Sequence, residues 1–122
     1  PVLVGNSLLG KVVAVGKGSS KVQLIFDNSV RIHGRNSSPG SDATGVVRGF
    51  SSNRLLMEKI LLEEKIAQGD KIVTSGEGGN YPSGLVLGFV ERVEEQSDLL
   101  KQAFLKSSID FSHLDDVFVL LL

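Results

Sequence analysis

The segment from residue 69 to residue 88 constrains the fold of this chain more than any other. Two apolar strand-like runs, 72–74 and 85–93, flank a loop that contains four glycines and one proline. Glycine is used where the backbone takes a positive φ or passes close to another group, and proline pre-sets φ for a turn. The loop holds no His, Cys, Lys or Arg, and Glu77 is its one acid. The pattern predicts strand, shaped loop and strand, and it indicates a structural or interaction protein rather than an enzyme.

Short apolar runs bounded by turn residues recur along the whole chain and predict an all-β protein. Fourteen glycines and β-branched runs about ten residues apart are typical of a small barrel or sandwich. The runs lie at residues 11–15, 22–26, 30–33, 46–47, 72–74, 85–93 and 117–122.

Two segments disagree with this reading at first sight. Residues 55–66 are good helix formers, but their apolar side chains would point nearly all round a helix axis and form no stripe. A strand buried on both faces explains the same pattern, and we favour the strand. In residues 97–105 local propensity favours a helix, with Ser97 as its N-cap.

Composition excludes several classes of protein. A net charge of −1 and a pI near 6.1 argue against nucleic acid as the main partner, because no basic field exists to release counterions. The absence of cysteine excludes disulfides, thiolate metal sites and cysteine nucleophiles. At 122 residues the chain suits one domain, or two very small ones that share a core.

No residue pattern predicts a catalytic, cofactor or metal site. His33 or His113 with Asp27 or Asp115 would serve a serine triad, but no serine stands in a Gly-x-Ser-x-Gly turn. Residues 113–116 are the one dense group of metal-ligand types, and we interpret them as a polar lead into the last strand. The glycine-rich segments lack the spacing of a phosphate-binding loop.

The chain resembles the MreC family of bacterial rod shape-determining proteins. Residues 69–85, GDKIVTSGEGGNYPSGL, with Gly88 beyond them, match the glycine segment of that family almost position by position. Residues 10–15 with 20–27 resemble the opening of its extracytoplasmic β region, and 110–120 are similar to its closing strand. The resemblance spans about residues 5 to 122.

This resemblance implies an all-β fold of two small packed β-barrels, mostly antiparallel, with the second inserted into the first. Chain order places the first barrel at residues 1–27 and 97–122, with its terminal strands paired, and the second at residues 28–96. In the family a membrane-spanning helix and a coiled coil precede the barrels. The resemblance therefore implies a location on the periplasmic face of the bacterial inner membrane, anchored by an N-terminal helix that this sequence does not contain.

The function implied is that of a non-enzymatic scaffold of the cell-elongation machinery, which organises peptidoglycan synthesis and rod shape. Its implied partners are a class B penicillin-binding transpeptidase, the membrane protein MreD and other copies of itself, as a dimer or filament. No cofactor is implied. Two alternatives stay open: a serine hydrolase of the trypsin-like barrel type, and a peptidoglycan-binding module. The second would need aromatic side chains on which sugars stack, and the chain has no Trp and only one Tyr.

Two sets of residues carry these hypotheses. Tyr81, Leu85 and Phe50 are candidate partner contacts, Tyr81 above all because a shaped loop would present it, although core packing explains each of them equally well. Ten motif residues are expected to shape the glycine loop and its flanks: Gly69, Asp70, Thr74, Ser75, Gly76, Gly78, Gly79, Pro82, Gly84 and Gly88.

Overall fold

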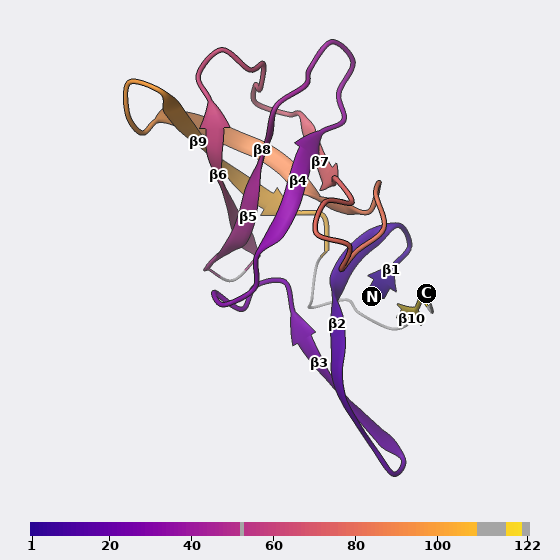
Figure 1. Ribbon diagram of the computed structural model, residues 1–122. Helices are drawn as coiled ribbons and strands as arrows, with labels where there is room; N and C mark the ends of the chain where they lie inside the picture. The colour runs from indigo at the N-terminus through magenta and orange to yellow at the C-terminus, as the bar shows by residue number, and fades with distance from the viewer. Residues whose placement is uncertain (52, 110–116, 121–122) are drawn as a thin grey trace.

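The structure is a computed structural model that describes residues 1–51, 53–109 and 117–120 (Figure 1). All regular elements in these ranges are strands, so the predicted all-β class is confirmed. The strands are β1 (Val2–Val4), β2 (Ser7–Gly16), β3 (Ser19–Leu24), β4 (Ile32–Asn36), β5 (Thr44–Ser51), β6 (Arg54–Leu61), β7 (Lys71–Thr74), β8 (Val86–Glu95), β9 (Leu100–Ser107) and β10 (Phe118–Val119).

Six of the strands close into an antiparallel barrel. Each neighbouring pair in the ring β4–β5–β6–β9–β8–β7 is hydrogen-bonded, and β7 pairs back onto β4. Closure removes the open edges that a flat sheet of the same strands would expose. The main hydrophobic cluster fills the barrel interior and extends to Leu8 of β2. Its fully buried barrel members include Val47, Leu55, Met57, Ile72, Leu87 and Leu105.

The remaining strands form a second antiparallel sheet in the order β3–β2–β1–β10. β2 also touches the barrel through one parallel pair, Ser7 opposite Val86. Beyond that contact β2 and β3 continue as a two-stranded hairpin that projects from the body of the molecule (Figure 1). The described residues of this part therefore form an open sheet beside one closed barrel.

The paired termini explain how one unit is inserted into the other. Val2 of β1 pairs with Val119 of β10, as expected, and all six barrel strands lie between β3 and β10 in the chain. The expected bounds differ from the strand pairing at one place. The sequence assigns residues 97–122 to the first unit, whereas β9 hydrogen-bonds to β6 and β8 of the barrel. We therefore propose that the inserted unit extends to Ser107.

The local helical propensity of residues 97–105 is overridden by strand pairing. The segment forms a hairpin turn followed by β9, because Ala103 and Leu105 fill the barrel interior between β6 and β8. Ser97, the expected helix N-cap, makes the hydrogen bonds of a cap within a turn instead. The Ser97 hydroxyl accepts the backbone N–H groups of Leu99 and Leu100 at 3.3 and 3.1 Å.

The strand favoured for residues 55–66 is confirmed over its first part, which lies in β6. Leu55 and Met57 point into the barrel core, while Leu56 is buried on the outer face. Burial on both faces removes the polar alternation that would have identified a strand, and this is why the segment resembled a helix.

Candidate interaction surfaces

Thr74, at the end of β7, holds the glycine loop in shape. Its backbone N–H donates to the Leu85 carbonyl at 2.8 Å, and its carbonyl accepts the Gly84 N–H at 2.9 Å. Its hydroxyl donates to the Pro82 carbonyl at 2.6 Å and accepts the Leu85 N–H at 2.9 Å. Because Thr74 is fully buried, this one residue closes the loop from inside the fold.

The glycines of the motif have the geometry that a structural role requires. Gly84 has φ +93° and Gly76 has φ +87°, in the region that side chains of L-residues rarely adopt. Gly88 is required for a different reason, since a Cβ there would lie 2.3 Å from the Lys106 carbonyl oxygen on β9. The other motif glycines with positive φ are Gly69, Gly78 and Gly79.

Asp70 ties two loops together at the end of the barrel where β7 begins. Its Oδ2 accepts the Asn36 side-chain amide at 2.8 Å and the Ala67 backbone N–H at 2.9 Å. Asn36 is itself buried, and its Oδ1 accepts the Ser38 N–H at 3.0 Å. Asn36 escaped the sequence analysis because its partner lies 34 residues away and no local pattern marks it.

The glycine loop does not present Tyr81 to solvent. Tyr81 is 8% exposed and belongs to the main core, and burial raises the pKa of its hydroxyl. Leu85 is half-buried and packs against the same core. Ser75 donates its backbone N–H to the His33 carbonyl at 2.9 Å, so the loop lies over β4. Of the three candidate contacts, Phe50 alone is exposed, at 53%.

Phe50 belongs to a row of side chains across the outer wall of the barrel, which we call the aromatic face. Strand register places Arg48 of β5 opposite Leu56 of β6, Leu56 opposite Phe104 of β9, and Phe104 opposite Arg92 of β8. The Phe50 ring meets the Phe104 ring edge-on, with centroids 5.3 Å apart, and the Arg92 guanidinium lies 3.9 Å above the Phe104 ring. The aromatic face thus consists of Arg48, Phe50, Leu56, Phe104 and Arg92.

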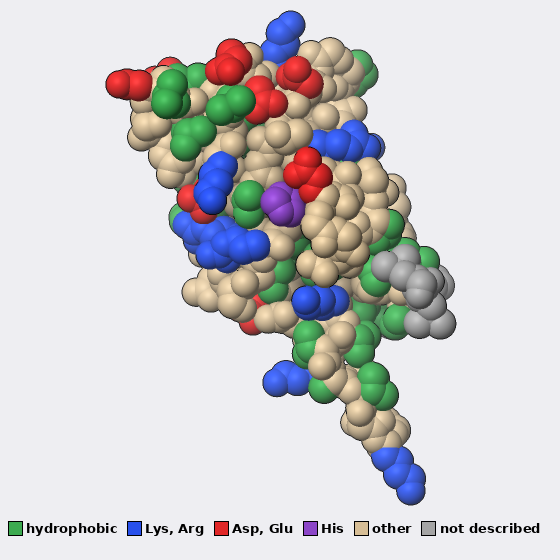
Figure 2. Space-filling model, in the orientation of Figure 1, with side chains coloured by type: hydrophobic (Ala, Val, Ile, Leu, Met, Phe, Trp, Pro, Cys, Tyr) green, Lys and Arg blue, Asp and Glu red, His purple; other side chains and the backbone are tan. Residues whose placement is uncertain are grey.

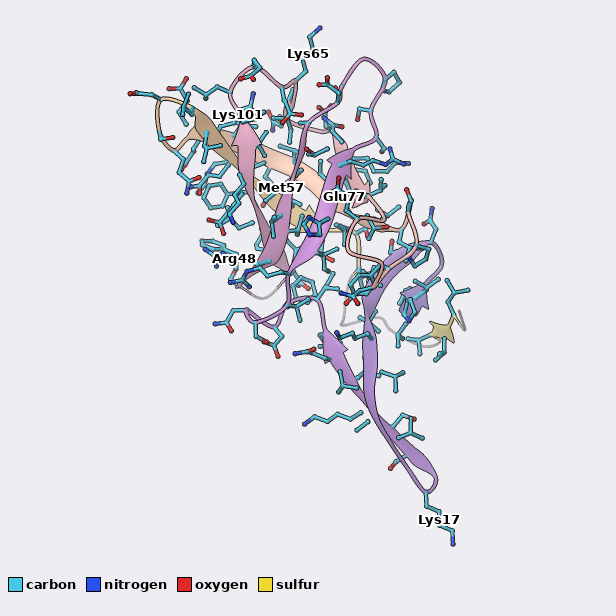
Figure 3. All side chains as sticks on the ribbon, viewed as in Figure 1. Lys17, Arg48, Met57, Lys65, Glu77 and Lys101 are labelled. Atoms are coloured by element: carbon cyan, nitrogen blue, oxygen red, sulfur yellow. The ribbon has the colours of Figure 1, made fainter. Side chains whose placement is uncertain are left out.

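Ion pairs hold the two arginines at the ends of this row. Arg48 pairs with Glu58, and Arg92 Nε lies 3.1 Å from Glu94 Oε1. Figure 3 shows Arg48 on the outside of the barrel and Met57 within it. Sequence reasoning found Phe50 but missed its neighbours, because they come from four strands and only the barrel register brings them together.

The structure shows no reactive cluster in the ranges that it describes. His33 Nδ1 lies 3.6 Å from Glu77 Oε2 on the surface of the glycine loop, where the histidine and the acid adjoin in Figure 2. Within the described ranges, no three His, Cys, Asp or Glu side chains gather where they would hold a metal ion. His113, Asp115 and Asp116 lie outside those ranges. No described helix is long and apolar enough to cross a membrane.

A closed six-strand barrel with a shaped loop places the chain in the class of small β-barrel domains. The family model "Rod shape-determining protein MreC, barrel core" matches residues 1–121. The chain therefore belongs to the MreC family.

Individual relatives agree with this assignment. The cell shape-determining protein MreC of Listeria monocytogenes is 33% identical over 123 residues, which cover 98% of this chain and 42% of that protein. The solved structure of MreC from the same organism superposes with a TM-score of 0.84 at 31% identity and covers 95% of this chain and 57% of that one. The chain spans less than half the length of the curated relative.

A further solved structure shares the fold. It is a complex between penicillin-binding protein PBP2 and MreC from Helicobacter pylori, and it matches with a TM-score of 0.75 at 22% identity. The match covers 95% of this chain and 73% of that one.

Proposed function

We propose that this chain is a non-enzymatic scaffold domain of the bacterial cell-elongation machinery, which binds a class B penicillin-binding transpeptidase. The observation that carries the proposal is the aromatic face. It is an exposed phenylalanine beside a buried one, flanked by two arginines that are already ion-paired. Aromatic and arginine side chains are the residue types that supply most of the binding energy at protein interfaces.

The arrangement of the face suits docking of a partner rather than binding of a small ligand. Phe104 is only 9% exposed because Arg92 and Phe50 cover it, so a partner meets a preformed surface with little side-chain entropy left to lose. The arginine charges are balanced by Glu58 and Glu94. An apolar group of the partner would pack on Phe50 without leaving a buried charge unpaired.

The complex of a related MreC with PBP2 supports a transpeptidase as the partner. In the mechanism that we propose, the scaffold prefers one conformer of the transpeptidase and so raises the fraction that is competent for peptidoglycan synthesis. We further propose that the chain works on the periplasmic face of the inner membrane, held there by an N-terminal anchor, and that it also contacts MreD and other copies of itself.

Titration of the chain with the purified extracytoplasmic part of the transpeptidase from the same organism tests the proposal. We expect saturable binding, and we expect Phe50→Ala to weaken it by about 10-fold or more, as truncation of a central interface residue does. Leu99→Ala is the matched control, since Leu99 is an exposed apolar residue in the turn between β8 and β9, away from the aromatic face.

Equal affinities for wild type and Phe50→Ala would show that another surface makes the contact. The two open alternatives have their own readouts. Labelling of the chain by a serine-directed fluorophosphonate would support a hydrolase, and saturable retention on purified peptidoglycan would support a cell-wall-binding module.

A further inference from the structure

The outer edge of β3 is an unpaired strand edge in the described part of the chain. β3 is hydrogen-bonded to β2 on one side, and no described strand pairs with its other side. Both strands are exposed along the distal half of the hairpin, from Val13 through Lys21. Such an edge presents backbone N–H and C=O groups to any extended segment that approaches it.

The hydrogen-bond pattern shows which residues face outward. Ile25 donates its N–H to the Leu9 carbonyl at 3.0 Å, toward β2. Because backbone polar groups alternate between the two sides of a strand, Ser20, Val22 and Leu24 direct theirs to the open edge. The Leu24 carbonyl already accepts the Asp27 N–H at 3.1 Å, so the open groups centre on Val22.

A groove lies along the same residues. It has a volume of about 490 Å³ and is lined by residues 21–24 of β3, together with Val13, Phe26 and Asp27. Val13 and Leu24 are exposed apolar residues, at 46% and 39%. Figure 2 shows hydrophobic side chains along the projecting hairpin and a lysine at its tip, which Figure 3 labels as Lys17. The groove thus offers apolar contact beside the open backbone groups.

We propose that this edge receives β3 of a second copy of the chain, antiparallel and centred on Val22. The inference deepens the proposed self-association and rests on it. This register makes all three outward residues face one another, Val22 opposite Val22 and Ser20 opposite Leu24. A shift by two residues toward the tip would instead place Lys21 opposite Lys21, and like charges directly opposite are destabilising.

Charge favours the same arrangement. In the register centred on Val22, Lys21 lies opposite an uncharged residue, Gln23, and Lys17 of each copy extends toward Asp27 of the other. Hydrogen bonds from the Ser29 backbone and side chain and from Gln23 lower the pKa of the Asp27 carboxyl, so it is ionised at neutral pH. Two strands of this length make a small interface, and we expect a weak, concentration-dependent dimer.

Single-cysteine variants test the register directly, because the chain has no cysteine of its own. In the proposed dimer Val22→Cys meets its own copy within disulfide range, whereas two Lys21→Cys residues are about 8 Å apart, too far for a bridge. We expect mild oxidation to produce at least about 10-fold more covalent dimer from Val22→Cys than from Lys21→Cys. Lys21 is the more exposed position, so random collisions would reverse that order.

The second test is analytical ultracentrifugation of chains without an introduced cysteine, at concentrations up to about 1 mM, which measures the oligomeric state. We expect wild type and Val22→Thr to self-associate and Val22→Pro to stay monomeric, since proline removes the central outward N–H without disturbing the bonds to β2. Circular dichroism verifies that Val22→Pro is folded. A wild type that stays monomeric, or equal cross-linking of the two cysteine variants, would overturn the inference.

The transpeptidase titration separates this inference from the proposed function. Transpeptidase binding without selective Val22→Cys cross-linking would contradict the β3 pairing alone. Selective cross-linking without transpeptidase binding would support the pairing and contradict the transpeptidase contact alone.

Discussion

Thr74 makes more of the glycine loop's hydrogen bonds than any glycine in it. Its hydroxyl alone makes two bonds across the loop: it donates to the Pro82 carbonyl and accepts the Leu85 N–H. The motif marked Thr74 as structural, but nothing in the linear pattern named its two partners, which lie 8 and 11 residues away. The physical reason for a threonine is that backbone groups of the loop that turn toward the buried Thr74 need partners within the protein.

We expect Thr74→Val to destabilise the fold by about 1–3 kcal/mol, because an isosteric methyl leaves the partly buried Pro82 carbonyl and Leu85 N–H without this partner. Thr74→Ser keeps the hydroxyl and is the matched control, with a much smaller loss. Urea unfolding measures both. Equal stabilities of the two variants would show that the hydroxyl bonds do not stabilise the loop.

The turn that ends β3 is a second element built by side-chain hydrogen bonds. Asp27 Oδ1 accepts the Ser29 backbone N–H at 2.9 Å and the Ser29 hydroxyl at 2.8 Å, while Gln23 donates to Oδ2 at 3.3 Å. These bonds favour the charged carboxylate and lower its pKa from the ordinary value of 3.8. The cluster Asp27-Asn28-Ser29 predicts a turn, and the carboxylate accounts for how tightly it closes.

The lowered pKa gives a pH dependence of defined sign. A carboxyl with a depressed pKa in the folded state stabilises the fold above its unfolded value of 3.8, and that contribution disappears as the pH falls through the folded value. We therefore expect Asp27→Asn to melt below wild type at neutral pH and to match it near pH 2. Thermal melts across this range provide the measurement, and a constant gap at every pH would contradict the assignment.

The conformation of β9 is determined by the strands on either side of it. Residues 97–105 are helical by local propensity, yet β9 completes the barrel between β6 and β8. Register shifts in both of these pairings adjust β9 to its neighbours. No single-segment pattern contains that information, because it depends on where two other strands lie.

In the whole molecule, the barrel and the small sheet share one hydrophobic cluster, which joins Leu8 of β2 to the barrel core. Val86 donates its N–H to the Asn6 carbonyl at 2.8 Å, and the Ser108 hydroxyl lies 2.7 Å from the Ser7 hydroxyl. The barrel is closed and densely packed, whereas the distal half of the β2–β3 hairpin is exposed on both strands. Local stability should therefore differ strongly between the two parts.

Hydrogen exchange on the intact chain measures that difference. At low concentration, where the chain is monomeric, we expect amides of Ala14 and Lys21 in the hairpin to exchange at least about 100-fold faster than those of Leu55 and Leu105 in the barrel. Uniform protection across both parts would contradict this expectation. Protection of the hairpin amides that rises with protein concentration would in addition support pairing at the β3 edge.

The amino-acid sequence by itself determined the all-β class, most of the strands, the shaped loop and the family, because these depend on local alternation, turn residues and a long contiguous motif. It also marked Phe50 as a candidate contact. The tertiary structure decided that Tyr81 is buried, that residues 100–107 form a barrel strand, and that Phe50, Phe104 and Arg92 share one face. These outcomes depend on strand register, since hydrogen bonding between distant segments sets which side chains meet and no segment carries that information alone.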